Sequence, residues 1–309
     1  MSINQLIEGI IAKKSPIVVG LDPRMEQLPE EIIKTYEDQG CSPYDIVKNS
    51  LIEFNKGIID SVKDLVPAVK PQVAFYEQYG LAGMEAYAET CRYAKASGLY
   101  VIADVKRGDI GSTSKAYSLG HLGKVLYKES KLNDFEADSV TVNPYLGDDC
   151  LGEFVDEIKA YDKGMFVLVK TSNKSSEQLQ NLSVEGKKIY EIVGEMVNDW
   201  CQKTIGSKNY SPVGAVVGAT YPSEMDTLRK VMPNAYFLVP GYGAQGGGGK
   251  DVVNAFNADG LGAIVNSSRG IIFAYKNSGL PYKEAARQAT LEMQTDINTA
   301  LEEAGKKYW

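Results

Sequence analysis

Four charged side chains in the segment Val101–Thr113 stand where a buried strand should end. The stretch VIADVKRGDIGST begins with apolar, β-branched residues and then places Asp104, Lys106, Arg107 and Asp109 within six positions. Residues at i and i+2 share one face of a strand, so Asp104 and Lys106 should point the same way, about 6.5–7 Å apart along the strand. Asp109 follows Gly108 and must be placed by the loop.

Other polar side chains follow the apolar runs at corresponding positions. Those at the ends of the predicted strands are Asp22, Lys70, Asn143, Thr171 and Ser172. Burying charges costs several kcal/mol per ion, and apolar replacement is often neutral or better for stability. Barrel interiors do hold structural ion pairs, but so many converging charges favour a functional site.

The neighbouring charges determine what the lysines can do. Lys70, on the adjacent predicted strand, can approach both Asp104 and Lys106, which gives an alternation of lysines and aspartates. Opposite charges keep every member ionised at neutral pH. A lysine held as an ammonium is a poor Schiff-base nucleophile. It is a good proton donor to a strongly basic centre, such as a carbanion.

A glycine-rich stretch, VPGYGAQGGGGKD at 239–251, follows a later predicted strand. Its G-x-G-x-x-G pattern is weak evidence for a dinucleotide site, because that pattern normally opens the first βαβ unit. A Walker loop fails because Lys250 is followed by Asp251. The loop can instead turn backbone N–H groups toward an anion, as after the seventh and eighth strands of many barrels. Arg269, in NSSRG, can bind phosphate in bidentate fashion. A plain flexible loop and a surface salt bridge are the alternatives.

Eight apolar runs alternate with helical patterns along the chain. The predicted strands are 16–22, 67–75, 99–106, 139–145, 165–172, 213–220, 235–240 and 262–268. Near-continuous apolar strands alternating with helices indicate a parallel sheet covered by helices. The sequence therefore predicts one α/β domain over residues 1–309, a (β/α)8 or TIM barrel, with long βα loops after strands 1, 5 and 7. A doubly wound sheet is the alternative.

Composition excludes several classes of protein. The chain has 309 residues, 44% of them apolar, and a net charge of −7, which suits a large core and argues against nucleic-acid binding. No apolar run is long enough to cross a bilayer, and we do not expect the N-terminal segment to be a signal peptide. The four scattered cysteines favour reduced thiols in a cytoplasmic protein without a zinc site. His121, the only histidine, is expected to be structural or at the surface.

The segment ADVKRGDIGST resembles the DxKxxD signature of the orotidine 5′-monophosphate decarboxylase family. Five further segments match that family in the correct order: GLDPR, VKPQVAFYEQYG, VKTSN, PGYGAQGG and SSRG. The segments KPQ, KTSN and RGDIGSTS are similar to the corresponding sequences of its longer, type 2 branch. The resemblance implies a carboxy-lyase that converts orotidine 5′-monophosphate to UMP in de novo pyrimidine biosynthesis. It implies no metal and no organic cofactor.

The resemblance also implies catalytic roles. Lys106 would protonate C6 of the pyrimidine after carbon dioxide leaves. Asp104 would lie near the substrate carboxylate, and Lys70 would bind the ribose and orient Asp104. Further residues would belong to a site shared between two subunits of a homodimer: Asp109, Ile110 and Thr113.

Substrate-binding roles follow in the same way. Asp22 would contact the ribose hydroxyls and Ser172 the pyrimidine edge. Gln245 and Arg269 would hold the phosphate. Gln72 and Asn143 lie near these positions without a firm assignment.

Three rival functions stay open. Metal-dependent sugar-phosphate enzymes share this barrel and the DxKxxD motif, but they carry an acidic metal ligand at the second strand end, where Lys70 would repel Mg²⁺. A non-catalytic nucleotide sensor is opposed by the intact Asp–Lys–Asp set. A dehydrogenase rests only on the glycine pattern.

Overall fold

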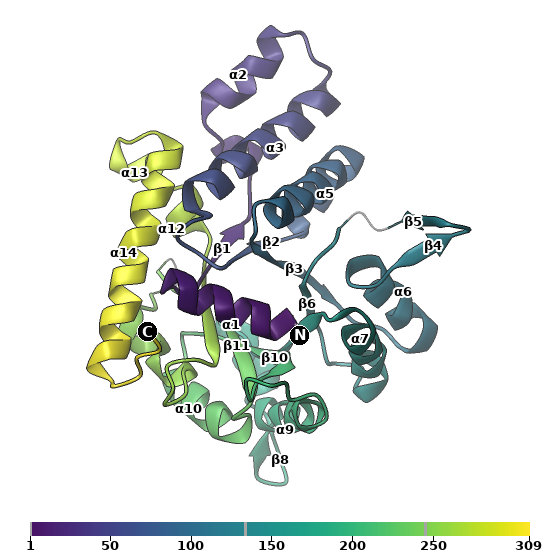
Figure 1. The fold of residues 1–309 in the computed structure, drawn as a ribbon, viewed down its shortest axis with the longest axis vertical. Helices are drawn as coiled ribbons and strands as arrows, with labels where there is room; N and C mark the ends of the chain where they lie inside the picture. The colour runs from purple at the N-terminus through teal and green to yellow at the C-terminus, as the bar shows by residue number, and fades with distance from the viewer. Residues whose placement is uncertain (1, 133–134, 244–245) are drawn as a thin grey trace.

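The computed structural model describes residues 2–132, 135–243 and 246–309. Within these ranges, eight parallel strands close into a barrel surrounded by helices (Figure 1). In order around the barrel they are β1 (Ile17–Leu21), β2 (Ala68–Pro71), β3 (Tyr100–Arg107), β6 (Ser139–Val142), β7 (Gly164–Lys170), β10 (Ser211–Val217), β11 (Ala235–Val239) and β12 (Ala263–Ser267). The (β/α)8 prediction is confirmed, and the doubly wound sheet is excluded because β1 pairs with both β2 and β12.

The predicted strands match the observed ones, with one notable boundary difference. The second strand was expected to reach residue 75, but β2 ends at Pro71 and α4 (Ala74–Glu77) begins soon after it. Val73, within this stretch, and Tyr76, just beyond it, are buried from the helical turn of α4 and not from a strand. A short apolar run does not distinguish a strand from a buried helical turn.

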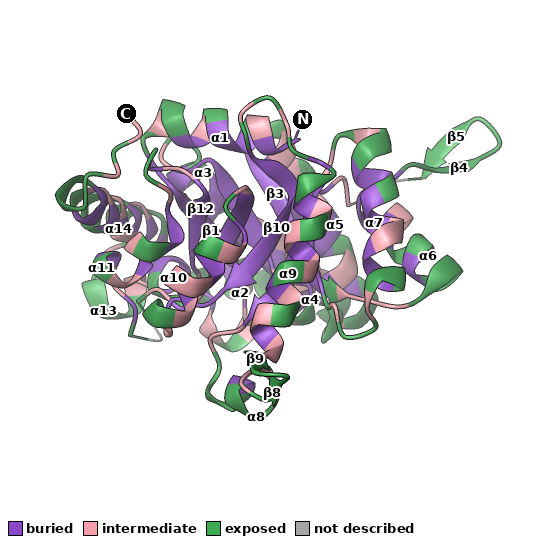
Figure 2. Cartoon of the chain, turned by 90° about the horizontal axis from the view of Figure 1, so that it is seen from below, coloured by how far each residue is buried: buried purple, intermediate pink, exposed green. Residues whose placement is uncertain are grey.

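Helices cover the outside of the barrel, and Figure 2 shows the buried strands enclosed by them. The main ones are α3 (Pro43–Val62), α5 (Gly80–Ala96), α6 (Gly111–His121), α7 (Asp148–Tyr161), α9 (Ile189–Gln202), α10 (Pro222–Val231) and α14 (Tyr282–Glu303). The start of α3 shows how the sequence fixes such a helix: the Ser42 side chain accepts a hydrogen bond from the Asp45 amide at 3.2 Å, and Pro43 occupies the first turn.

The N-terminal end of the barrel is closed by α1 (Ser2–Lys13). Its residues Ile3, Leu6, Ile7 and Ile10 recur at helical spacing and are buried in one cluster with inward-facing strand residues. Those strand residues include Val18, Ala68, Tyr100, Ile102, Phe166 and Tyr236. This apolar plug leaves only the opposite end of the barrel, where the strands end, for a polar cavity.

Three βα connections are long. The one after β1 contains η1 (Met25–Gln27) and α2 (Glu30–Asp38), and the one after β7 contains η2 (Lys174–Ser176), α8 (Glu177–Gln180) and the hairpin β8 (Ser183–Val184)/β9 (Lys187–Lys188). The connection after β11 leads to α11 (Gly249–Val252) and η3 (Val253–Ala255). After β12, α12 (Arg269–Ile272) and α13 (Tyr275–Ser278) precede α14.

A second hairpin was not expected from the sequence. It consists of β4 (Val125–Tyr127) and β5 (Ser130–Leu132), follows α6 and projects from the body of the molecule (Figure 1). Among the described helices, none combines the length and apolarity that a membrane crossing needs.

Candidate active site

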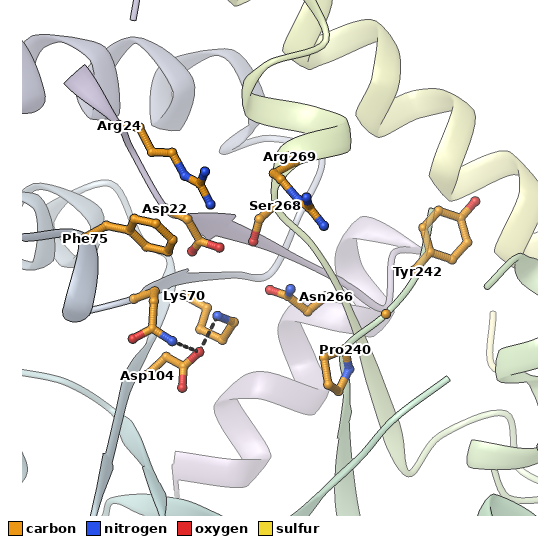
Figure 3. Close-up of a pocket in the computed structure, with 12 residues that line it drawn as sticks. Asp22, Arg24, Lys70, Phe75, Asp104, Pro240, Tyr242, Asn266, Ser268 and Arg269 are labelled. Carbon is orange, nitrogen blue, oxygen red and sulfur yellow. Dashed lines mark hydrogen bonds and ion pairs between the residues drawn. The ribbon is translucent and has the colours of Figure 1, made fainter. Parts of the chain in front are cut away.

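A cavity of about 390 Å³ opens at the C-terminal ends of the barrel strands (Figure 3). It is lined by Asp22, Arg24, Lys70, Gln72, Phe75, Asp104, Pro240, Gly241, Tyr242, Asn266, Ser268 and Arg269. These residues come from the ends of β1, β2, β3, β11 and β12 and from the turns that follow them. This is the end of a (β/α)8 barrel at which enzymes of this fold place their active sites.

Asp104 is the centre of the charged network. Its Oδ2 accepts hydrogen bonds from Lys70 Nζ at 2.7 Å and Gln72 Nε2 at 2.9 Å. Its Oδ1 accepts from Lys106 Nζ at 2.6 Å and Thr141 Oγ1 at 2.8 Å. Burial alone would raise the pKa of Asp104, but the Lys70 and Lys106 ammonium groups outweigh burial and hold the pKa well below its usual range. The carboxylate therefore stays ionised and organises its four donors.

Lys70 is held as an ammonium in an almost closed environment. The residue is 5% exposed, and burial would lower its pKa, but the carboxylates of Asp104 and Asp22 outweigh burial and raise it. The alternation of lysines and aspartates expected from the sequence is thus present, and Lys70 remains charged at neutral pH.

Lys106 reaches Asp104 from a strained backbone. Its φ of 46° lies in the left-handed region, which costs a non-glycine residue about 1–3 kcal/mol. The pairing of β3 with β6 shifts register between Ala103 and Arg107, and the Lys106 amide donates to Thr141 Oγ1 at 2.9 Å. The expected proximity of Lys106 and Asp104 is found, but an irregular strand end produces it. Such strain is typical of functional positions.

Asp22 has an unused oxygen beside the cavity. Its Oδ1 is buried without a hydrogen-bond partner among the described residues. Burial raises the pKa of Asp22, and Lys70 and a hydrogen bond with Ser268 offset part of that rise. A β-carbon on Gly20 would lie 1.8 Å from Ser268 Oγ, so only glycine leaves room for the Ser268 side chain against β1 here. The free oxygen is suited to a ligand hydroxyl group.

Not every predicted site residue lies at the cavity. Arg269, the first residue of α12, does line it. Asp109, Ile110, Thr113 and Ser172 do not line the cavity of their own chain. Lys106 is not a lining residue either, but its Nζ is bound to Asp104, which is.

Asp109 and Ile110, in the turn after β3, and Thr113, in the first turn of α6, lie near the surface. Asp109 Oδ1 accepts a hydrogen bond from the Ile110 amide at 2.8 Å, and Ile110 is 55% exposed. The predicted phosphate ligand Gln245 lies outside the described residues.

Gln72 and Asn143, which the sequence left without an assignment, lie in different surroundings. Gln72 belongs to the Asp104 network, whereas Asn143 is exposed and its Oδ1 accepts from the Tyr145 amide at 3.1 Å. Sequence reasoning did not single out Thr141. The available signal was its position two residues before Asn143, which places it on the same strand face.

Several cavity residues also escaped the sequence analysis. They are Arg24, Phe75, Pro240, Tyr242, Asn266 and Ser268, whereas Gly241 belongs to the glycine-rich stretch already expected to face an anion. Each lies within or beside a motif already noted, so position next to a strand end was the signal that could have found them.

The remaining chemistry-bearing groups lie apart from the cavity. His121 is 6% exposed and stacks on Phe135 with ring centroids 5.2 Å apart. Burial, assisted by Arg107, lowers the pKa of His121 to about 4, so its imidazole is neutral near pH 7. The four cysteines are free thiols. In the described part of the chain, no group of three or more His, Cys, Asp or Glu residues is arranged to hold a metal ion.

These features define a (β/α)8-barrel enzyme whose site holds two ammonium groups against one buried carboxylate. Comparison with known proteins makes the assignment specific. The model of the family described as orotidine 5′-phosphate decarboxylase / HUMPS matches residues 15–284. The chain belongs to this family, which confirms the resemblance found in its motifs.

Relatives match over almost their whole length. An orotidine 5′-phosphate decarboxylase of Caldicellulosiruptor bescii is 43% identical over 299 residues, which cover 96% of this chain and 98% of the relative. One from Rhodopirellula baltica is 45% identical over 300 residues, with coverage of 95% and 97%. The protein is therefore a carboxy-lyase.

Solved structures of related proteins match this chain in sequence and in fold. The OMP decarboxylase of Leishmania donovani is 32% identical with a TM-score of 0.72, and the match covers 97% of this chain and 98% of that one. The UMP synthase of the same organism is 34% identical with a TM-score of 0.73 and covers 96% of this chain. This chain spans 56% of that longer protein.

Proposed function

We propose that this carboxy-lyase converts orotidine 5′-monophosphate to UMP and carbon dioxide in de novo pyrimidine biosynthesis. The name that near-full-length relatives carry supports this substrate. The observation that carries the proposal is the Lys70–Asp104–Lys106 network at the mouth of the barrel. The expected cytoplasmic location remains a prediction.

Lys106 is the proton donor in the proposed mechanism. When the bond between C6 and the carboxylate breaks, carbon dioxide leaves and the electron pair stays on C6. The Lys106 ammonium stabilises this carbanion and then transfers a proton to C6, and solvent returns a proton to the amine. Its side chain is 47% exposed, so solvent can reach it. One unit charge at ~4 Å and an effective dielectric near 20 contributes about 4 kcal/mol.

Asp104, itself bound by Lys70, positions the Lys106 ammonium. Both oxygens of Asp104 are saturated by donors, and its pKa is depressed, so it cannot serve as a base near neutral pH. It fixes Lys106 before the substrate arrives, and such preorganisation costs no rearrangement during the reaction. In this position it also faces the substrate carboxylate, which leaves as neutral carbon dioxide.

Binding away from the reacting carbon supplies the rest of the rate enhancement. Enzymes lower barriers by roughly 8–23 kcal/mol, more than one charge provides. Arg269 and Gln245 are assigned to the phosphate, Asp22 to the ribose and Ser172 to the pyrimidine. Support comes from Arg269 at the cavity wall and from the unpartnered Oδ1 of Asp22. Binding energy from the phosphate is then used at the reacting carbon.

The active unit is a homodimer with shared sites. Asp109, Ile110 and Thr113 are assigned to the cavity of the partner subunit. Two observations support this: these residues do not line the cavity of their own chain, and Ile110 exposes 55% of its surface. A large apolar side chain so exposed beside the site is suited to a subunit contact.

Metal-dependent chemistry on a sugar phosphate is the second candidate, because the family description also includes HUMPS proteins. The second-strand end carries Lys70, whose pKa is raised, in the place of an acidic metal ligand. A fixed ammonium repels Mg²⁺, so we expect full activity in EDTA.

One experiment tests the mechanism and the shared site together. Turnover of orotidine 5′-monophosphate is followed by absorbance for the wild type, for Lys106→Ala, for Asp109→Ala and for an equimolar mixture of the two variants refolded together. Each variant alone should lose about 10³-fold or more in kcat, the equivalent of about 4 kcal/mol. The mixture should recover roughly a quarter of wild-type activity, because half of its dimers are mixed and each has one intact site.

The outcomes separate the claims. Wild type without turnover contradicts the substrate, and an active Lys106→Ala variant contradicts the proton donor. A mixture no more active than its components contradicts the shared site.

A further inference from the structure

Two arginines from adjacent strand ends line the cavity, and only one of them has been given a role. Arg24 follows β1, and Arg269 begins α12 directly after β12. The two strands are paired, with Val19 opposite Ser267. Both arginines line the same cavity, on either side of Asp22 and Ser268 (Figure 3).

The charges of the cavity leave Arg24 without an internal partner. Lys70 and Lys106 are both bound to Asp104. Across the residues that the structure describes, neither Arg24 nor Arg269 forms an ion pair with a carboxylate, whereas Arg107 just outside the cavity does. Guanidinium groups left free at a cavity wall are suited to an anionic ligand.

A phosphate needs more charge than Arg269 supplies. A phosphate monoester carries about −1.5 to −2 charges at pH 7. The amide of Gln245 is neutral, and the nearby Asp22 carboxyl cannot compensate a negative ligand. Of the cavity-lining cations described, Arg24 is the one not yet matched to an anion.

Phe75 holds the Arg24 side chain in position. The guanidinium carbon of Arg24 lies 4.9 Å from the centroid of the Phe75 ring. Stacking on a ring restrains the guanidinium plane and leaves its N–H groups free at the edges. The aromatic residue at the start of α4 therefore presents the donors of Arg24 ready-oriented, with less side-chain entropy to lose on binding.

We propose that Arg24 is a second phosphate-binding arginine, so that the substrate phosphate is bound between the ends of β1 and β12. This inference rests on the proposed function and deepens it. It assigns the recognition of the phosphate dianion to two guanidinium groups instead of one and makes Phe75 a positioning residue for the second.

The test compares two substrates that differ only in the phosphate. Arg24→Ala, Arg24→Lys and wild type are assayed on orotidine 5′-monophosphate and on orotidine at high enzyme concentration. Arg24→Ala should lower kcat/KM for the phosphorylated substrate about 10- to 100-fold, as expected for a lost charged hydrogen bond. Its kcat/KM for orotidine should be unchanged, and Arg24→Lys should fall between. Equal losses on both substrates, or no loss on the phosphorylated one, would overturn the proposal.

Two further variants serve as controls. Phe75→Leu removes the ring and should show a smaller loss with the same substrate selectivity. Arg287→Ala removes an arginine that is bound to Asp64 on the surface, and it should leave both substrates unaffected.

A binding measurement separates this inference from the proposed function. Inorganic phosphate is titrated into wild type and Arg24→Ala and followed by calorimetry. Its dissociation constant should rise in the variant at least several-fold. If wild type fails to decarboxylate the nucleotide but shows this difference, the proposed function fails and the phosphate role stands. Unchanged phosphate affinity in the variant overturns the role of Arg24.

Discussion

The two ends of the barrel are built from the same strands but hold opposite kinds of side chain. On β2, Ala68 belongs to the apolar layer closed by α1, and Lys70, one strand period further on, belongs to the charged network. On β3, Ile102 and Asp104 show the same change. Two residues along a strand therefore separate a layer that stabilises the fold from a layer that performs chemistry.

The difference lies in what surrounds each layer. The apolar layer is sealed by Leu6 and its neighbours on α1, so burial stabilises the fold there by about 1.5–3 kcal/mol for each large side chain. The charged layer is open to a cavity, and its ions gain little for stability after their desolvation is counted. Each layer should therefore respond differently to substitution.

The largest expected effect is a loss of activity when the buried Lys70–Asp104 ion pair is replaced with apolar residues. Lys70→Met combined with Asp104→Leu should reduce kcat by about 10³-fold or more, because the ammonium of Lys106 loses its anchor. Stability should be unchanged or higher, because apolar replacement of a buried ion pair is often neutral or better. Steady-state kinetics and urea denaturation measure the two quantities.

The matched control is the single change Asp104→Leu. It should lower the free energy of unfolding by about 3–5 kcal/mol, because it leaves the buried Lys70 ammonium without its hydrogen-bonded carboxylate. If the double variant is less stable than this single one, the charged layer is structural and the comparison between the two ends fails.

The apolar end should respond in the opposite sense. Leu6→Ala should destabilise the protein by about 2–5 kcal/mol through loss of contacts and a residual cavity. Its kcat/KM, measured well below the melting temperature, should stay within about two-fold of wild type, because Leu6 lies at the other end of the barrel. Leu126→Ala on the projecting hairpin, where the leucine is 65% exposed, is the matched control and should change stability by less than about 0.5 kcal/mol. A large kinetic defect in Leu6→Ala would show that the two layers are coupled.

The smallest expected effect is on the pH dependence of stability, and it comes from His121, which belongs to neither end of the barrel. The folded pKa of His121 is lowered to about 4 from an ordinary value of 6.5. Below pH 6.5 the histidine of the unfolded chain binds a proton, whereas the buried His121 of the folded protein stays neutral. The free energy of unfolding therefore falls as the pH is lowered from 6.5 toward 4. The loss amounts to about 3 kcal/mol at most. Urea denaturation of wild type and His121→Gln at pH 7 and pH 4.5 measures it. An equal pH dependence in both proteins would refute the assignment.

Much of the architecture was readable from the sequence because it depends on local pattern. Continuous apolar strands alternating with helices predicted the barrel, and the charges at strand ends predicted the face on which the cavity lies. The grouping of Asp104, Lys70 and Lys106 followed from strand periodicity and from the order of neighbouring strands. The hairpin at 125–132 was missed because its exposed residues follow no core pattern.

Other parts of the site depend on contacts between distant segments. Thr141, on β6, and Gln72, directly after β2, both donate hydrogen bonds to Asp104, and no local pattern marks them as partners. The left-handed backbone of Lys106 follows from a register shift between β3 and β6. Arg24, after β1, meets the ring of Phe75, from α4, only in the folded chain.

The sequence by itself determined the alternation of strands and helices, the apolar face of α1 and the residue types placed at each strand end. It could do so because periodicity and residue type act over a few neighbouring positions. Only the tertiary structure decided which of those polar groups meet, which oxygen of Asp22 is left without a donor and which arginines share one cavity. Those outcomes depend on barrel closure, which brings β12 beside β1 across more than 240 residues of chain.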